Sequence, residues 1–144
     1  MKTNLTFLLV NESATIRKVW RQKLIQFQAE IIEAASAEEA LAIFESHSVS
    51  LIIADCQLSP YQGKELVSLV RQLSVGAHTG FVMVQPRSNQ KRSETAYEAG
   101  ANLVLTQNEE EATWHQSLAH LLKKGENHVG SLILVVDDSP ALLG

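Results

Sequence analysis

The stretch LIIADCQ, residues 51–57, decides the fold. It begins with an uninterrupted apolar run, Leu51 to Ala54, which is typical of a strand buried on both faces of a parallel sheet. The run stops at Asp55, and the loop that follows contains Pro60, so a carboxylate stands where the strand ends. We therefore expect a central strand with an acidic group at its carboxyl end.

Short apolar runs alternate with amphipathic stretches on both sides of this strand. Ser13 and Ser36 are good helix N-caps, and Gly63 precedes a third amphipathic stretch. We expect strands at residues 5–10, 30–35, 51–54, 81–84 and 103–106, and helices after Ser13, Ser36 and Gly63 and over 88–99 and 109–123. The first helix is expected to bury Ile16, Val19, Trp20, Leu24 and Phe27. The alternation predicts an α/β fold, a doubly wound five-stranded parallel sheet with helices on both faces.

Composition and charge narrow the class of protein. The chain has 144 residues, 45% of them hydrophobic, which fits one compact domain. It has no secretory signal and no stretch near the roughly 20 apolar residues of a membrane span. A single cysteine, Cys56, excludes an internal disulfide and fits a cytoplasmic location. The formal net charge of -4 argues against direct nucleic-acid binding and favours protein partners.

The order of these units, with an acidic group after the first strand and Asp55 after the third, resembles the receiver domains of two-component response regulators. The most specific local match is EAGANLVLTQ, residues 98–107, which is similar to the family's EAGA-D-D-Y-L-T-K segment. The resemblance covers about residues 4–124. It implies a flavodoxin-like sheet in the order 2-1-3-4-5, with a phosphorylation pocket at the carboxyl ends of the strands.

The resemblance also implies a phosphoacceptor and a metal site. Asp55 matches the phosphoacceptor aspartate of the family. Glu12, Asp55 and the backbone carbonyl of Gln57 match ligands of Mg²⁺. Asn11 stands where the family has a carboxylate, and its neutral oxygen makes it a weak ligand. Any Mg²⁺ binding is therefore expected to be weak.

Three further positions of the pocket depart from the family pattern. The family's Thr or Ser, its lysine and its switching aromatic fall at Gln85, Gln107 and Val104. Phosphoryl transfer relies on placement and on positive charge around the phosphoryl oxygens, and Gln107 brings no ammonium group. If Gln85 points into the pocket, we expect its amide to hydrogen-bond Asp55 and to fill space that a phosphoryl group needs. The pocket thus keeps its phosphoacceptor and lacks most of the surrounding catalytic groups of the family.

Other polar residues have ordinary structural interpretations. An isolated aspartate after a strand is often a turn or cap residue, and only the matching register gives Asp55 another role. The five histidines lack metal-ligand spacing. The basic residues of two surface segments are interpreted as solvated faces, with a docking surface as the alternative; they are Arg17, Lys18, Arg21 and Lys23 in one, and Arg87, Lys91 and Arg92 in the other.

A short internal repeat lies near the end of the chain. LILVVDDS, residues 132–139, repeats the plan of TFLLVNES, residues 6–13, so Asp137 and Asp138 stand where Asn11 and Glu12 do. This repeat predicts a receiver domain at 1–124, a polar linker at 125–131, and the first strand of a truncated second receiver at 132–144. That last segment is expected to be disordered or to pack between molecules.

Two hypotheses of function remain open. In the first, the chain is a degenerate receiver that serves as a regulatory or protein-docking module beside its own downstream receiver or an effector domain. In the alternative, it accepts a phosphoryl group on Asp55 from a histidine kinase or phosphotransfer protein. Homodimerisation is open in both, and enzymatic activity would amount at most to Mg²⁺-dependent autophosphorylation and slow autodephosphorylation. A nucleotide-binding flavodoxin-like protein is disfavoured because the first strand is not followed by a glycine-rich loop.

Overall fold

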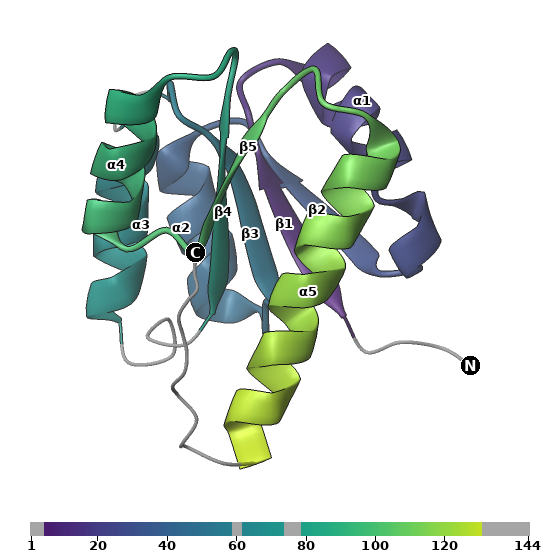
Figure 1. Ribbon diagram of the computed structural model, residues 1–144. Helices are drawn as coiled ribbons and strands as arrows, with labels where there is room; N and C mark the ends of the chain where they lie inside the picture. The colour runs from purple at the N-terminus through teal and green to yellow at the C-terminus, as the bar shows by residue number, and fades with distance from the viewer. Residues whose placement is uncertain (1–4, 59–61, 74–78, 131–144) are drawn as a thin grey trace.

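Within the residues that the computed structural model describes, 5–58, 62–73 and 79–130, five strands alternate with five α-helices (Figure 1). The strands are β1 Thr6–Val10, β2 Glu30–Ala34, β3 Leu51–Asp55, β4 Gly80–Gln85 and β5 Leu103–Thr106. The helices are α1 Ala14–Lys23, α2 Ala37–Ser46, α3 Gly63–Gln72, α4 Gln90–Ala99 and α5 Glu111–Gly130, with a short 3-10 helix, η1, at Ile25–Phe27.

All strands of the sheet run parallel in the order β2-β1-β3-β4-β5, as the sequence predicted. The central strand β3 pairs with β1 through Val10 and Ala54 and with β4 through Asp55 and Val84. Because every strand points the same way, the carboxyl ends of β1, β3, β4 and β5 lie along one edge of the sheet. That edge carries the polar residues identified above.

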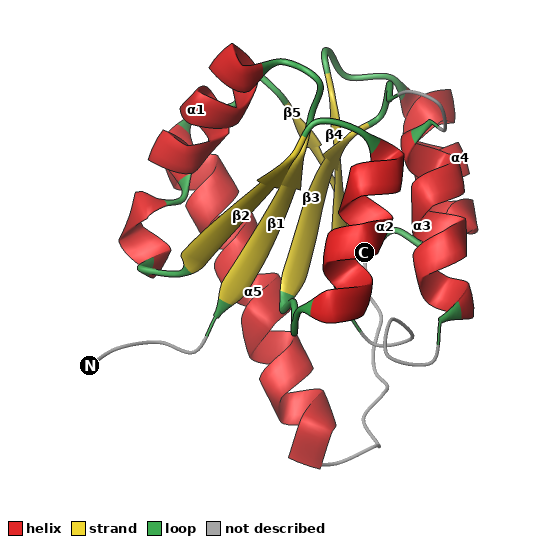
Figure 2. Ribbon diagram, turned by 180° about the vertical axis from the view of Figure 1, so that it is seen from behind, coloured by secondary structure: helices red, strands yellow, loops and turns green. Residues whose placement is uncertain are grey.

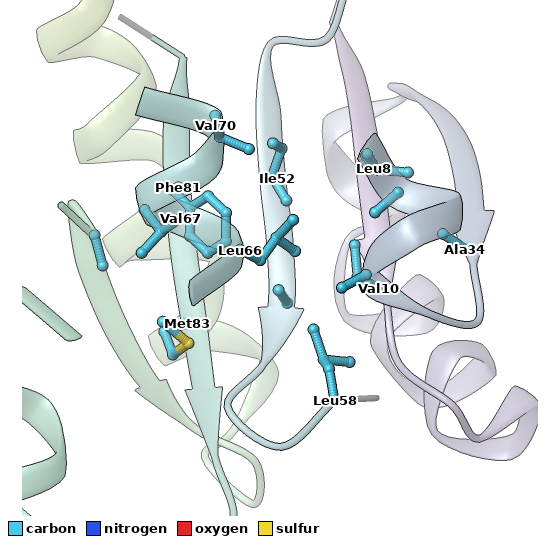
Figure 3. Packing of buried hydrophobic residues seen from close by; sticks show 14 of the residues in the cluster. Leu8, Val10, Ala34, Ile52, Leu58, Leu66, Val67, Val70, Phe81 and Met83 are labelled. Carbon is cyan, nitrogen blue, oxygen red and sulfur yellow. The ribbon is translucent and has the colours of Figure 1, made fainter. Parts of the chain in front are cut away.

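Helices cover both faces of the sheet (Figure 2). Successive strand residues belong to two different buried clusters, because neighbouring side chains of a strand point to opposite faces of the sheet. On one face, Phe81 and Met83 of β4 pack with Val67 of α3 and Ala96 of α4 (Figure 3 shows part of this cluster). On the other face, Val82 and Val84 of β4 pack with Trp20 of α1. Trp114 and Leu118 of α5 belong to the same cluster.

The helix ends follow the predicted capping chemistry. The Ser13 hydroxyl accepts a hydrogen bond from the backbone N–H of Ile16, and that of Ser36 accepts one from Glu39. At the start of α3, Gln62 and Glu65 form a reciprocal capping box. These local bonds fix where each helix begins, and hence where each loop leaves the carboxyl edge of the sheet.

Gly63 allows α3 to begin against the end of β3. A Cβ atom at this position would lie 2.4 Å from Sδ of Met83 and 2.6 Å from the backbone oxygen of Asp55. The second neighbour is backbone and cannot move away as a flexible side chain can. The absence of a side chain at Gly63 therefore lets the loop after Asp55 close tightly.

Two details differ from the sequence prediction. Val19 was expected in the core but is 40% exposed, because the buried face of α1 is centred on Trp20 and the chain continues through Leu24 into η1. The last helix was expected to end at 123 and residues 125–131 to be a linker, yet α5 continues to Gly130. One glycine inside a helix costs only about 1 kcal/mol, so Gly125 does not end it.

The second-receiver prediction falls on residues 132–144, including Asp137 and Asp138, and these lie outside the described residues. Through the part of the chain that is described, no helix is both long enough and apolar enough to cross a membrane.

Candidate functional site

Asn11, Glu12 and Asp55 come together where β1 and β3 end. Pairing of Val10 with Ala54 brings the next residue of each strand to the same edge. Nδ2 of Asn11 donates a hydrogen bond to Oδ2 of Asp55 at 3.4 Å. Glu12 is exposed at the rim, and its charge raises the pKa of the Asp55 carboxyl. An amide and two carboxylates thus share one corner of the sheet edge.

Asn11 is held in an orientation that presents N–H groups to Asp55. Its side chain is only 4% exposed, and its Oδ1 accepts a hydrogen bond from the backbone N–H of Ser13 at 2.8 Å. Its own backbone N–H donates to the carbonyl of Ala34, and its backbone carbonyl accepts from Arg17. The neutral oxygen considered as a weak metal ligand is therefore engaged by Ser13, and the nitrogen faces the carboxylate.

Asp55 is half-buried, and its surroundings act on its ionisation in opposite directions. Burial raises the pKa of this carboxyl above its ordinary value of 3.8, and the charge of Glu12 raises it further. The backbone N–H groups of Gln57 and Cys56 lower the pKa by bonding the ionised form, and the positive charge of Arg92 on α4 lowers it as well. The net direction is upward, so this site disfavours a bare carboxylate.

Gln85 does not contact Asp55 as expected. It follows Phe81 and Met83 in the strand alternation, so it projects toward α3 and α4. Its Nε2 donates a hydrogen bond to Oγ of Ser93 on α4 at 3.2 Å, and the side chain is 4% exposed. Its Oε1 is buried and has no hydrogen-bond partner among the described residues. The hydrogen bond to Asp55 that an inward-pointing Gln85 would make is not found among the described residues, because the alternation directs this amide to the helix.

Gln107 is fixed through its backbone at the end of β5. Its N–H donates to the carbonyl of Gln85 at 2.8 Å. Its carbonyl accepts from Nζ of Lys23 on α1 at 3.0 Å, and the same ammonium also bonds the carbonyl of Glu109 and lies 4.9 Å from the ring centroid of Trp114. Lys23, interpreted from sequence as part of a solvated face, instead anchors the β5–α5 loop. Arg17 and Arg21 of the same group both pair with Glu33.

The donor set at Asp55 is poor for a divalent cation. Among the described residues, no group of three or more His, Cys, Asp or Glu side chains is placed to hold a metal ion. Asp55 and the exposed Glu12 are the carboxylates at this corner, and Asn11 offers N–H groups there. Mg²⁺ prefers several oxygen ligands in octahedral geometry, and the two carboxylates supply only part of that set.

The sequence of the chain matches the model of the response regulator receiver domain over residues 7–119. The chain belongs to the receiver domain family of response regulators. Receiver domains act in two-component signalling. A search of curated proteins found no match.

Solved receivers share the fold of this one. The chemotaxis response regulator CheY4 of Vibrio cholerae is 25% identical, with a TM-score of 0.77 over 83% of this chain and 99% of that chain. A CheY-like receiver domain protein from Methanospirillum hungatei is 22% identical, with a TM-score of 0.79 over 88% and 99%. The receiver domain of a sensor histidine kinase from Pseudomonas aeruginosa, solved with a magnesium ion in its active-site cleft, is 19% identical, with a TM-score of 0.76 over 84% and 99%.

Val104, which the resemblance matches to the family's switching aromatic, lies on the edge strand β5. Val104 is half-buried there, and its backbone N–H donates to the hydroxyl of Tyr97 on α4 at 3.1 Å. Tyr97 is 47% exposed, so an aromatic ring is present at this face but comes from the helix. The hydrogen bond between the Tyr97 hydroxyl and the strand backbone links α4 to β5 at this face.

No sequence pattern pointed to Ser93, and Arg92 was indicated only as part of a basic surface segment. Arg92 acts electrostatically on Asp55, and Ser93 binds Gln85. Both lie in the first turn of α4, behind the N-cap Asn89. No local pattern marks them, because their contacts depend on how α4 packs against the ends of β3 and β4.

Proposed function

We propose that this receiver is degenerate and works as a regulatory or protein-docking module in two-component signalling. The observation that carries the proposal is the hydrogen bond from Asn11 to Asp55, in which an amide N–H occupies the side of the acceptor carboxylate where receivers need metal-binding oxygens. Asp55 keeps its position at the end of β3, while the groups that would neutralise a phosphoryl group are replaced.

The distribution of charge around Asp55 supports this proposal. In-line phosphoryl transfer to a carboxylate is driven by cations placed around the equatorial oxygens, with little covalent help from the protein. Gln107 brings no ammonium, Gln85 is turned to Ser93, and the metal donor set is incomplete. Arg92 is the positive charge that acts on Asp55, and it comes from α4 instead of β5. A phosphoryl group on Asp55 would therefore be poorly stabilised.

The proposed partners are proteins, and the proposed location is the cytoplasm. We infer that the receiver contacts its own downstream receiver or an effector domain, and that a histidine kinase or phosphotransfer protein acts on that neighbour. The repeat at 132–139 supports a second receiver beginning at residue 132, with Asp137 and Asp138 as its acidic pair. The sequence encoded beyond residue 144 tests this part, and anything other than a second receiver there would contradict it. Homodimerisation is a further proposal, tested by the sedimentation velocity of the chain.

The alternative is a working receiver that accepts a phosphoryl group on Asp55 with low efficiency. It is favoured by the position of Asp55, which is half-buried at the sheet edge with Glu12 beside it. In this alternative, Mg²⁺ binds weakly to Glu12, Asp55 and the backbone carbonyl of Gln57. That metal would supply the positive charge that the pocket lacks.

Acetyl phosphate separates the two functions. The chain is incubated with acetyl phosphate and Mg²⁺, and intact-mass spectrometry counts the phosphoryl groups added. A restored variant, Asn11→Asp, Gln85→Thr and Gln107→Lys, serves as the positive comparison, and the same variant with Asp55→Asn as the negative one. The proposal predicts a phosphorylated restored variant and an unmodified natural chain. Stoichiometric phosphorylation of the natural chain, lost with Asp55→Asn, would establish the alternative.

A further inference from the structure

A basic pocket lies between α3 and α4, beside the loop that follows Asp55. These two helices run next to each other on the same face of the sheet (Figure 1). The pocket has a volume of about 360 Å³, within the range of small-ligand sites. Cys56 and Gln57 form its side toward β3, Lys64 lines it from α3, and Lys91 and Arg92 line it from α4. It adjoins the corner formed by Asn11 and Asp55, but neither of those two residues lines it.

The charged side chains that line this pocket have one sign. Lys64, Lys91 and Arg92 all line it, and none of its described lining residues is acidic. This is unusual in a chain whose formal net charge is -4. A concave surface lined by charges of one sign concentrates the field and attracts ions of the opposite sign. The pocket is therefore suited to an anion.

The remaining lining residues indicate what kind of anion fits. Met83 and Ala96 are buried and provide an apolar wall, while Gln57 and Asn89 provide amide groups. Three cations on two helices match several oxygens of a dianion better than the single charge of a monocarboxylate. The apolar wall has room for a small organic body attached to that dianion. The volume suits a small molecule and is too small for a folded partner.

We propose that this pocket binds a small phosphate monoester, with Lys64, Lys91 and Arg92 around the phosphate and the organic group against Met83 and Ala96. The ester lies next to Cys56 and Gln57, the residues that follow Asp55 in the chain. The site is a binding site for an intact ester, and no group transfer is part of the proposal.

The proposal is tested by amide NMR titration with three probes, phenyl phosphate, inorganic phosphate and phenol, at constant ionic strength in EDTA. Phenyl phosphate should shift the amides of Gln57, Lys64, Arg92 and Thr95 in a saturable way. Inorganic phosphate should bind more weakly at the same amides, and phenol should leave them in place. Equal affinity for phenyl phosphate and inorganic phosphate would overturn the assignment to an ester, as would the absence of saturable shifts.

Variants localise the binding. Lys64→Gln and Arg92→Gln should each weaken phenyl phosphate binding by at least about threefold, as expected for loss of one partly exposed charge pair. Lys18→Gln removes the same charge from the exposed face of α1 and should leave the affinity unchanged. Equal weakening by all three would show nonspecific attraction and overturn the proposal. Spectra without ligand verify that each variant is folded.

A further comparison separates this pocket from the phosphorylation corner. Asp55→Asn should retain phenyl phosphate binding in EDTA, because Asp55 is not among the residues that line the pocket. Loss of binding in this variant, or a requirement for Mg²⁺, would place the ester at the acceptor site and overturn the proposal. Neither result depends on whether Asp55 is phosphorylated by acetyl phosphate, so the two proposals fail independently.

Discussion

Nδ2 of Asn11 lies 3.4 Å from Oδ2 of Asp55, and Oδ1 of the same amide accepts the backbone N–H of Ser13. This arrangement fixes which end of the amide the acceptor carboxylate meets. The hydrogen bond brings an N–H group to the Asp55 carboxylate, and it leaves the amide oxygen of Asn11 outside the ligand set that a divalent cation would use.

Replacing Asn11 with Asp should create a better metal site. The new carboxylate adds a charged oxygen beside Asp55 and Glu12, and Mg²⁺ affinity should rise by about tenfold, equivalent to about 1.4 kcal/mol. Isothermal titration with MgCl₂ measures the change. Gln116→Glu adds the same charge on an exposed position of α5 and should not alter the affinity. Unchanged binding in Asn11→Asp would show that Asn11 does not limit the metal site.

The ionisation of Asp55 should destabilise the fold. Its pKa is raised in the native state, chiefly by burial, so native Asp55 holds its proton to higher pH than the unfolded chain does. This contribution to stability is fully present below the ordinary value of 3.8 and is lost as pH rises through the native pKa. Asp55→Asn should therefore gain stability relative to the natural chain as pH rises from 3.8 through the native pKa of Asp55. Urea unfolding across this range measures the difference, and a gain that is independent of pH would contradict the assignment.

Gly63 should tolerate no side chain. Gly63→Ala would press a Cβ atom against the backbone oxygen of Asp55 and against Met83, and should cost about 1–3 kcal/mol. Ser68→Ala lies on the same helix and loses only a local bond to Lys64, so its effect should remain within about 0.5 kcal/mol. Both values come from urea unfolding midpoints. Equal stability of the two variants would mean that the loop after Asp55 adjusts freely.

Ser93 should matter mainly because it holds Gln85. Ser93→Ala leaves the buried amide of Gln85 without its hydrogen bond and should cost about 1–2 kcal/mol. The double variant Gln85→Met, Ser93→Ala removes both polar partners and should recover most of that loss. A double-mutant cycle from thermal or urea unfolding gives the coupling. Additive effects of the two changes would contradict a direct bond between these residues.

The fold was predictable because its signals are local. The apolar run at Leu51–Ala54 and the caps at Ser13 and Ser36 act within a few residues, and the strand order follows the family pattern. Side-chain partners at the sheet edge were less predictable. Gln85 lies at the end of β4, near the end of β3, but the alternation of side chains along β4 directs it to Ser93 on α4. The electrostatic influence of Arg92 depends on the packing of α4, which no local pattern reveals.

The end of α5 and the contacts of Lys23 were also not predictable from local patterns. Polar composition and glycines after residue 123 predicted a linker. The structure instead continues α5 to Gly130. Polar residues and single glycines lower helix propensity only slightly, so they are compatible with a helix. Lys23 was interpreted as solvated because its helix face is polar. Its contacts with the β5–α5 loop join segments far apart in sequence.

Beryllofluoride binding tests the central claim most directly. This phosphoryl mimic needs both an accessible acceptor carboxylate and a bound divalent cation, so it reports on the whole pocket at once. Fluorine NMR of the natural chain with beryllofluoride and excess Mg²⁺ should show only free fluoroberyllates, whereas the variant carrying Asn11→Asp, Gln85→Thr and Gln107→Lys should show a protein-bound signal. A stoichiometric bound signal from the natural chain, abolished by Asp55→Asn, would contradict the degenerate assignment.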